Sequence, residues 1–355
     1  MPRSAPHRLS PASATQASLP FGAVMATGGA AHLAHACGIP SVASPLLWLA
    51  VAEGVCITAF NLYRHRRGMT RSMLTWLTAG SPRQHAGRLT IPLGLAVISV
   101  GLARNFGACT VSPITAAGLV LTGLATLVGV GRFIGALHGM KPRLETIDGQ
   151  WFLVPAALLG AAVATIAALP PAAIPLHDPL AETAIIAAIA GLAGYWLILA
   201  GAGLRVLYHG LRNSPGAPWW IAMGCAGLAA AATSSVLQPG ADAGLPVTLH
   251  DPLETATIAT LLMSLVLAIP VVLLSLDFLF RRCHFANRTH WPPTFSTAVL
   301  AMGALGVGTL LGCNASTALG IIAGWATLAL WLTSSAWDVG FASRLVWRFV
   351  TARRS

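Results

Sequence analysis

Ten long apolar runs occupy most of this 355-residue chain and limit what it can fold into. They lie at about 20–38, 43–62, 89–106, 112–139, 151–170, 183–207, 219–237, 253–280, 294–313 and 315–338. A helix of about 20 apolar residues matches the hydrocarbon thickness of a bilayer. Because backbone amides and carbonyls cannot stay unbonded in lipid, such runs cross a membrane as helices. The sequence therefore predicts an all-α polytopic membrane protein with ten transmembrane helices.

The composition agrees with this fold class. Hydrophobic residues make up 55% of the chain and charged residues only 9%, a balance that water-soluble folds of this size do not have. The formal net charge of +11 is spread over short segments between the apolar runs, without the interleaved aromatic residues of a nucleic-acid surface. We therefore expect a lipid bilayer, and no nucleic acid, among the partners.

The basic residues predict the topology. Loops after runs 1, 5, 7 and 9 hold no Lys or Arg. Loops after runs 2, 4, 6 and 8 hold Arg64, Arg66, Arg67, Arg71, Arg83, Arg88, Lys141, Arg143, Arg212, Arg281, Arg282 and Arg288. Basic loops stay on the cytoplasmic side, so both termini are predicted to be cytoplasmic in a cell membrane of inner or plasma type. Arg104 is then the one basic residue clearly at the outer face.

The chain divides into three parts. Residues 1–19 are polar and rich in Pro, Ser and Ala, without the apolar stretch of a cleavable signal, and are expected to form a disordered cytoplasmic tail. Residues 20–340 hold the ten runs and are expected to form one transporter domain. Residues 341–355 mix apolar residues with Arg and are expected to form a basic cytoplasmic tail.

A repeated phrase indicates how the helices are paired. Leu-His-Asp-Pro-Leu occurs at 176–180 and again at 249–253, each time before an apolar run. Asp is a preferred N-cap and Pro fits the first helical position, so each copy predicts a helix start, although two unrelated caps are the alternative. Besides the run that follows the first copy, one further run precedes the second copy, which favours a repeating unit of two helices. The outer polar groups of the two phrases are candidates for proton coupling or anion attraction: His177, Asp178, His250 and Asp251.

The odd-numbered runs differ in composition from the even ones. They are rich in Gly, Ala, Ser and Thr, and they contain no Asp or Glu. Small residues let helices approach closely, and Pro or Gly permits bends. Two interpretations remain open, namely tight packing alone or five helices that surround a pathway with the even helices outside.

Four stretches in the odd runs carry recognisable motifs: Pro20–Gly28, Asp148–Pro155, Pro218–Gly224 and Val299–Gly303. In this order they resemble the first, fifth, seventh and ninth helices of the tellurite-resistance/C4-dicarboxylate transporter family, which also contains the slow-type anion channels of plant guard cells. The first stretch, PFGAVMATG, is similar to the family's aromatic-Phe-Ala-x-Val-Met-Ala-Thr-Gly, and the second contains Gly-x-Trp-Phe. The ninth-helix motif, Val-Phe-Pro-Leu-Gly, appears here as Val-Leu-Ala-Met-Gly.

The resemblance implies five helical hairpins in a quasi-five-fold arrangement around a central pore, with protomers that associate as trimers. It also implies that the cargo is a small anion. In channel members the Phe of the ninth-helix motif plugs the pore, and that position corresponds to Leu300 here. Carried over residue by residue, the pore or gate positions are Phe21, Thr27, Gly28, Phe152, Pro155, Gly224, Leu300, Gly303 and Thr309.

Ionisable residues inside the runs are candidates for function because they are costly in a membrane. Glu53 and Arg132 lie at similar distances from the cytoplasmic ends of their runs, so they form either a structural pair or part of a transport site. His32 and His35 either titrate near neutral pH or satisfy hydrogen bonds at the interface. Arg104 either attracts anions or extends to lipid headgroups.

No stretch has the pattern of an enzyme site. The chain lacks a phosphate-binding Gly-rich loop, a nucleophile elbow and metal-ligand spacing, so we expect no catalysis, metal or cofactor. Without an ATP site, transport is passive or driven by an ion gradient. The first hypothesis is a secondary transporter or exporter of a C4-dicarboxylate, sulfite or tellurite-type oxyanion, with protons as the candidate coupling ion. A passive gated anion channel is the second, and a membrane scaffold or sensor without flux is the third.

Overall fold

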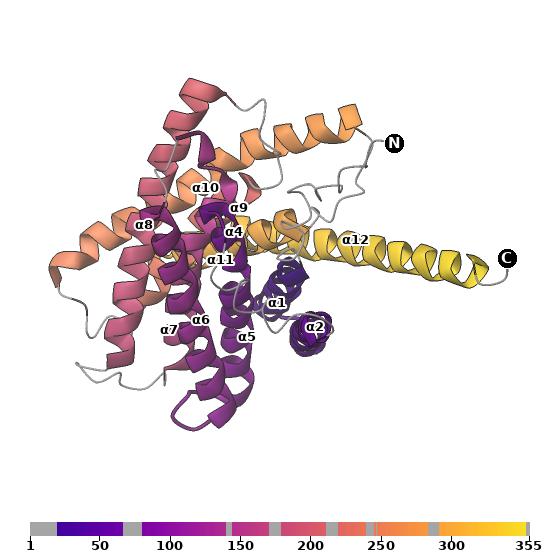
Figure 1. Cartoon of the computed structure of the whole chain (residues 1–355). Helices are drawn as coiled ribbons and strands as arrows, with labels where there is room; N and C mark the ends of the chain where they lie inside the picture. The colour runs from indigo at the N-terminus through magenta and orange to yellow at the C-terminus, as the bar shows by residue number, and fades with distance from the viewer. Residues whose placement is uncertain are drawn as a thin grey trace.

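The computed structural model describes residues 20–66, 80–139, 144–169, 179–210, 219–238, 245, 247–282 and 291–352, and within these ranges all regular structure is helical (Figure 1). The α-helices are α1 (Pro20–Ala36), α2 (Pro40–Arg66), α4 (Pro82–Arg88), α5 (Thr90–Phe106), α6 (Pro113–His138), α7 (Leu153–Ala168), α8 (Pro179–His209), α9 (Trp219–Val236), α10 (Val247–Arg282), α11 (Trp291–Leu311) and α12 (Asn314–Ala352). Two short 3₁₀ helices, η3 (Leu144–Thr146) and η4 (Gly149–Phe152), precede α7.

The predicted ten spans are confirmed. Nine helical segments of the described ranges are long and apolar enough to cross a membrane, and the 17-residue α1 supplies the tenth. Helices α4 and α5 together form one of the nine, Pro82–Phe106. The helix is interrupted at Leu89 because Pro92 has no amide to bond the carbonyl four residues earlier and its ring crowds that carbonyl.

The tails and one repeated phrase are only partly covered. Residues 1–19, His177 and Asp178 lie outside the described residues. Helix α12, drawn in yellow in Figure 1, continues past the expected domain end at 340 and ends at Ala352. Residues 341–352 therefore continue the helix that contains the last span, and that span runs over Asn314–Asp338.

The helices form five hairpins around a closed ring. Each hairpin packs two consecutive spans together: α1 with α2, α5 with α6, α7 with α8, α9 with α10 and α11 with α12. The first helices of the hairpins also contact one another in cyclic order, α1 to α5, α7, α9 and α11, and α11 returns to α1. Figure 1 shows that the hairpins are inclined to one another rather than parallel.

Burial separates the ring from the outer helices. Between 61% and 89% of the residues are buried in the spans that contain α5, α7, α9 and α11, against 17% to 28% in the five outer spans. The outer helices therefore present their apolar side chains to lipid. This confirms the prediction that the odd-numbered spans, rich in small residues, form the inside of the bundle.

Glycine explains how closely the inner helices approach. A Cβ atom added at Gly227 of α9 would lie 2.7 Å from the backbone nitrogen of Leu300 in α11. A Cβ added at Gly303 would lie 2.5 Å from the carbonyl oxygen of Gly227. The backbones of α9 and α11 are thus in direct contact, so no side chain fits between them.

The close contact of α9 and α11 predicts the effect of adding one methyl group at Gly227. Gly227→Ala should lower stability by about 1–3 kcal/mol because the added atom meets backbone, which cannot rotate away. Gly123→Ala on α6 is the matched control, since a Cβ there meets nothing within 4 Å. The midpoint of thermal unfolding in detergent measures both variants. Equal midpoints for the two variants would contradict the close contact of α9 and α11.

One predicted helix start is wrong. The second Leu-His-Asp-Pro-Leu phrase does not begin a helix, because α10 begins at Val247 and contains Pro252. Leu249 and Leu253, four residues apart on α10, pack with Leu245, which precedes the helix, in one apolar cluster that stabilises the helical turn before Pro252. Asp251 consequently lies in the second turn and is not an N-cap. The first phrase precedes α8, which begins at Pro179 as predicted.

Candidate functional site

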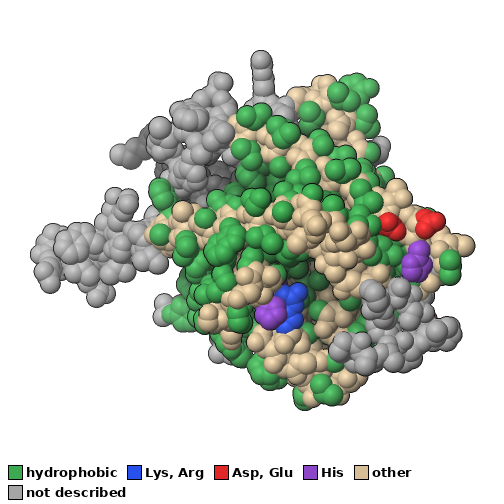
Figure 2. Space-filling model, turned by 180° about the vertical axis from the view of Figure 1, so that it is seen from behind, with side chains coloured by type: hydrophobic (Ala, Val, Ile, Leu, Met, Phe, Trp, Pro, Cys, Tyr) green, Lys and Arg blue, Asp and Glu red, His purple; other side chains and the backbone are tan. Residues whose placement is uncertain are grey.

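A cavity of about 630 Å³, here called the vestibule, lies where the C-terminal ends of the five ring helices meet. All five ring helices contribute to its wall, and so do the segments that follow α5 and α9. Figure 2 shows a basic side chain beside a histidine in a hollow of a face that is otherwise largely hydrophobic or uncharged. The polar side chains that line the vestibule are His32, Arg104, Ser234, Ser235, Gln238 and Thr309.

Arg104 gives the vestibule its charge. It is the only Lys, Arg, Asp or Glu among the described residues that line the cavity. The position follows from the sequence, because Arg104 lies in the last turn of α5, where a cation is favoured by the negative end of the helix dipole. The vestibule is therefore suited to an anion.

His32 of α1 holds the Arg104 guanidinium in place. The Nη1 atom of Arg104 lies 3.3 Å from Nδ1 of His32, and Nε2 of His32 lies 2.9 Å from the carbonyl oxygen of Val97. A guanidinium only donates and a carbonyl only accepts, so Nδ1 must accept and Nε2 must carry the hydrogen. His32 is neutral in this arrangement. A proton on Nδ1 and the contact with Arg104 exclude each other.

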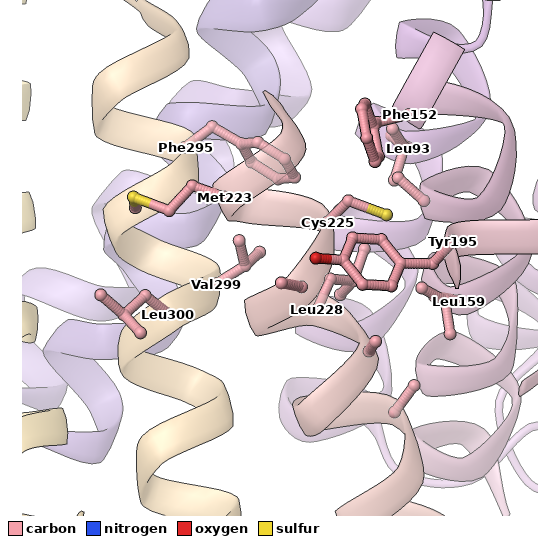
Figure 3. Close-up of a cluster of buried hydrophobic side chains, with 14 of the residues drawn as sticks. Leu93, Phe152, Leu159, Tyr195, Met223, Cys225, Leu228, Phe295, Val299 and Leu300 are labelled. Carbon is pink, nitrogen blue, oxygen red and sulfur yellow. The ribbon is translucent and has the colours of Figure 1, made fainter. Parts of the chain in front are cut away.

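An apolar constriction adjoins the vestibule. A small cavity of about 30 Å³ shares His32, Val100, Val163 and Met302 with the vestibule wall. Its other large side chains are apolar: Leu93, Val97, Leu228, Phe295 and Val299. This volume is about that of one water molecule, so the small cavity cannot hold a hydrated anion. Phe295 and Val299 extend into the middle of the buried cluster in Figure 3.

Leu300, the gate position that the motif alignment implied, lies away from both cavities. It does not line the vestibule or the constriction, and its backbone packs against Gly227 of α9. Figure 3 shows its side chain extending away from Phe295 and Val299. Phe295, which lies at the constriction, was missed by the alignment. It is the only aromatic residue in the ninth apolar run, 294–313, and this signal would have found it.

Thr27 and Glu53 are brought together outside the vestibule. Thr27 Oγ1 donates to Glu53 Oε1 at 3.2 Å and accepts a hydrogen bond from Trp331 Nε1 at 3.0 Å. This network joins α1, α2 and α12. The structure does not pair Glu53 with Arg132, whose side chain lies in a separate cavity beside His85 of α4. Of the two interpretations of these charges, a direct pair is therefore excluded.

Most of the other motif residues lie at helix contacts. Gly28 faces Val97, Gly224 faces Ser296, and Phe21 packs with Val24 and Ala50. Phe152 lies with its ring centroid 5.7 Å from that of Tyr195, and the Pro155 carbonyl approaches Gly191 of α8. Gly303 contacts α9, as described above. These six residues shape the ring and do not line the two cavities, whereas Thr309 lines the vestibule.

The remaining histidine and aspartate candidates lie outside the lining. His35 is exposed near the end of α1, and Asp251 is exposed on α10 next to the partly exposed His250. None of the three lines the vestibule. Ser234, Ser235 and Gln238 do line it and were not predicted, although they are polar residues at the end of an otherwise apolar run.

Comparison with known proteins agrees with this architecture. None of the curated proteins compared with this chain matches it. The family model for the voltage-dependent anion channel (SLAC1) matches residues 19–336, which is most of the chain and extends from the first span into the tenth. The resemblance to the tellurite-resistance and C4-dicarboxylate transporter proteins, which are related to this family, is thereby confirmed. The chain belongs to the voltage-dependent anion channel family and is a polytopic membrane protein for anion transport or conduction.

Proposed function

We propose that this protein is a secondary transporter or exporter of a small anion such as a C4-dicarboxylate, sulfite or a tellurite-type oxyanion. The observation that carries the proposal is the Arg104 guanidinium in a vestibule of about 630 Å³ whose described lining holds no carboxylate. A cavity of this size accommodates a dicarboxylate or an oxyanion. A guanidinium also matches two oxygens of either group.

The contact between His32 and Arg104 supports coupling to protons. An anion that draws Arg104 away leaves Nδ1 of His32 without its donor, and a proton then occupies the vacated position. The other titratable group that acts on His32 is His35, which is also on α1. Binding of the anion and of a proton would therefore favour each other, as linkage requires.

A passive gated channel is the alternative, favoured by the description of the matching family. The apolar constriction fits either function, since a narrow apolar segment blocks ions by excluding water until it widens. A carrier opens one side at a time, whereas a channel opens a continuous path. A scaffold or sensor without flux is the third possibility.

The proposal includes the orientation of the protein in the membrane. We place the vestibule at the outer face, with both termini in the cytoplasm of an inner or plasma membrane, because the basic loops follow the even-numbered spans. Protomers are proposed to form trimers, on the family resemblance alone. Modification of single introduced cysteines in intact cells tests the orientation, and the mass of the detergent-solubilised particle tests the trimer.

Flux measurements on purified protein in liposomes test the function. We expect uptake of malate or sulfite, and no uptake of sodium, because an anion is matched to Arg104. A carrier should saturate, move the anion uphill when a pH gradient is imposed, and give no unitary currents. His32→Gln keeps a donor for Val97 but cannot take up a proton, so it should remove the uphill movement. Sodium uptake would contradict an anion pathway, and current steps without uphill movement would favour the channel.

A further inference from the structure

A second cavity, of about 640 Å³, lies outside the ring between α4 and α6, and we call it the lateral cavity. One side is polar and includes His85 of α4 and Arg132 of α6. The other side is formed by α6 residues that are apolar or lack a side chain, namely Leu127, Val128, Gly131, Gly135 and Ala136. Only 17% of the α6 span is buried, so this cavity opens on the surface that faces lipid.

The positive charge of the polar side comes from Arg132. His85 is only 3% exposed, and Nη1 of Arg88 lies 3.2 Å from its Nδ1, so the guanidinium donates to the imidazole and Nδ1 carries no proton. Arg132 is exposed on α6, and no carboxylate of the described residues lies within 4 Å of its guanidinium. Arg132 precedes the end of α6 at His138 by six residues, or about 9 Å along the helix axis, a depth from which a long side chain reaches the headgroup layer.

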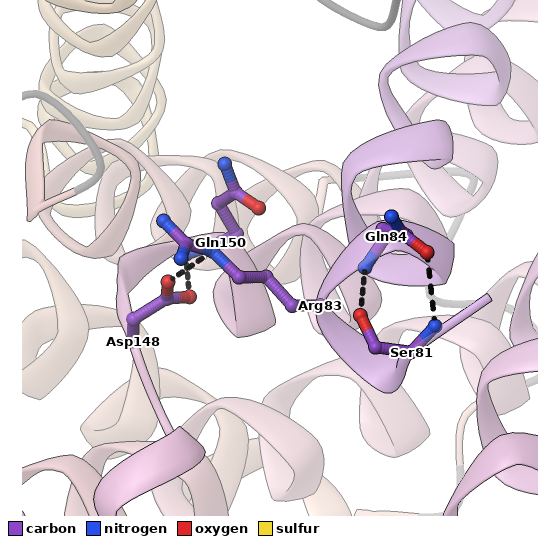
Figure 4. Close-up of polar contacts among 5 residues, drawn as sticks. All are labelled: Ser81, Arg83, Gln84, Asp148 and Gln150. Carbon is purple, nitrogen blue, oxygen red and sulfur yellow. Dashed lines mark hydrogen bonds and ion pairs between the residues drawn. The ribbon is translucent and has the colours of Figure 1, made fainter. Parts of the chain in front are cut away.

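Two contacts at its N-terminal end hold α4 in place. Ser81 and Gln84 form a reciprocal capping box at its start, and Nε of Arg83 lies 2.8 Å from the Asp148 carboxylate (Figure 4). Burial raises the pKa of Asp148 above its usual range, against the opposing charges of Arg83 and Arg205. The Asp148 carboxylate is thus paired with Arg83 of α4. It does not neutralise the positive charge of the lateral cavity.

The apolar side forms a shallow groove along α6. Leu127, Gly131 and Gly135 recur every four residues and therefore lie in one row on the helix surface. A Cβ atom added at Gly131 or Gly135 would meet no atom within 4 Å, so both positions border open space. Leu127 is 70% exposed and Val128 is 53% exposed, and both continue the apolar surface toward the middle of the span.

We propose that the lateral cavity binds an anionic phospholipid. The lipid phosphate lies against Arg132, beside His85 of α4, and one acyl chain lies in the groove over Gly131 and Gly135. The charge of the cavity, its opening toward lipid and the continuous apolar row together match the two halves of such a molecule. Bound lipid would bridge α4 and α6 and so stabilise the hairpin that carries Arg104.

Binding is tested on the purified full-length chain with phosphatidylglycerol, with phosphatidylcholine and inorganic phosphate as separate arms. Native mass spectrometry measures retained lipid, and thermal unfolding measures stabilisation. We expect phosphatidylglycerol to bind in preference to phosphatidylcholine and to raise the unfolding midpoint. Arg132→Gln should weaken this binding roughly tenfold, because one charged hydrogen-bonding partner is lost.

A second pair of variants separates the groove from the charge. Gly131→Leu should fill the groove and weaken phosphatidylglycerol binding, whereas Gly123→Leu, also at an open position of α6, should not. Both are expected to fold because a Cβ atom at either position meets nothing within 4 Å and both positions border open space. Equal binding of the two lipids, stabilisation by inorganic phosphate alone, or equal effects of Gly131→Leu and Gly123→Leu would each overturn the proposal. None of these readouts depends on anion transport.

Discussion

Phe295→Ala should raise anion flux through reconstituted protein by about tenfold, which corresponds to a barrier lowered by about 1.4 kcal/mol. Phe295 supplies the largest side chain at the apolar constriction beside the vestibule. Removing its ring widens the segment where water is excluded, so the cost of passing a hydrated anion falls. Efflux of chloride or malate from liposomes measures the change, and Phe295→Leu should give a smaller increase because it keeps an apolar side chain there.

Leu300→Ala is the matched control on the same helix. Leu300 is buried, as Phe295 is, but it lines neither cavity. Its truncation should cost about 2–5 kcal/mol of stability by leaving a cavity, without raising flux. If instead Leu300→Ala leaks and Phe295→Ala does not, the gate lies where the motif alignment placed it and the constriction described above is not the barrier.

Arg104→Gln should lower anion flux by about tenfold or more, since a charge in a cavity with low-dielectric walls concentrates counter-ions by 10- to 1000-fold. Arg104→Lys should retain part of the flux, because the charge stays while the paired guanidinium geometry is lost. The concentration dependence of uptake separates the effects: loss of binding raises the half-saturating concentration. His35→Gln, near the same face but outside the vestibule lining, is the control.

An unchanged flux in Arg104→Gln would show that Arg104 does not bind the transported anion. Arg104 would then serve only to hold His32 and to satisfy the end of α5, and the anion would have to be bound by the neutral groups of the vestibule. Ser234, Ser235 and Gln238 are the side chains to change next, because they line the opposite wall on and after α9.

The amino-acid sequence by itself determined the number of spans and their approximate ends, and it favoured a division into inner and outer helices that the burial of the spans then established. This was possible because a helix in lipid must satisfy its own backbone, so length and hydropathy identify each span without reference to its neighbours. The small residues of the odd-numbered spans predicted the ring for a similar reason, since helices rich in Gly and Ala can approach closely. Within the described residues, the Asp-Pro signal failed at α10, where packing of Leu249 and Leu253 with Leu245 overrode it.

Only the tertiary structure decided which side chains line the two cavities. Successive residues of a helix point about 100° apart, so Val299 lines the constriction while Leu300 packs toward α9, a difference that hydropathy cannot detect. The contact of Arg104 with His32 joins residues 72 positions apart, and that of Trp331 with Thr27 joins residues 304 apart. Such pairs depend on how the five hairpins close into a ring, because the return of α11 to α1 sets the rotation of every helix within it.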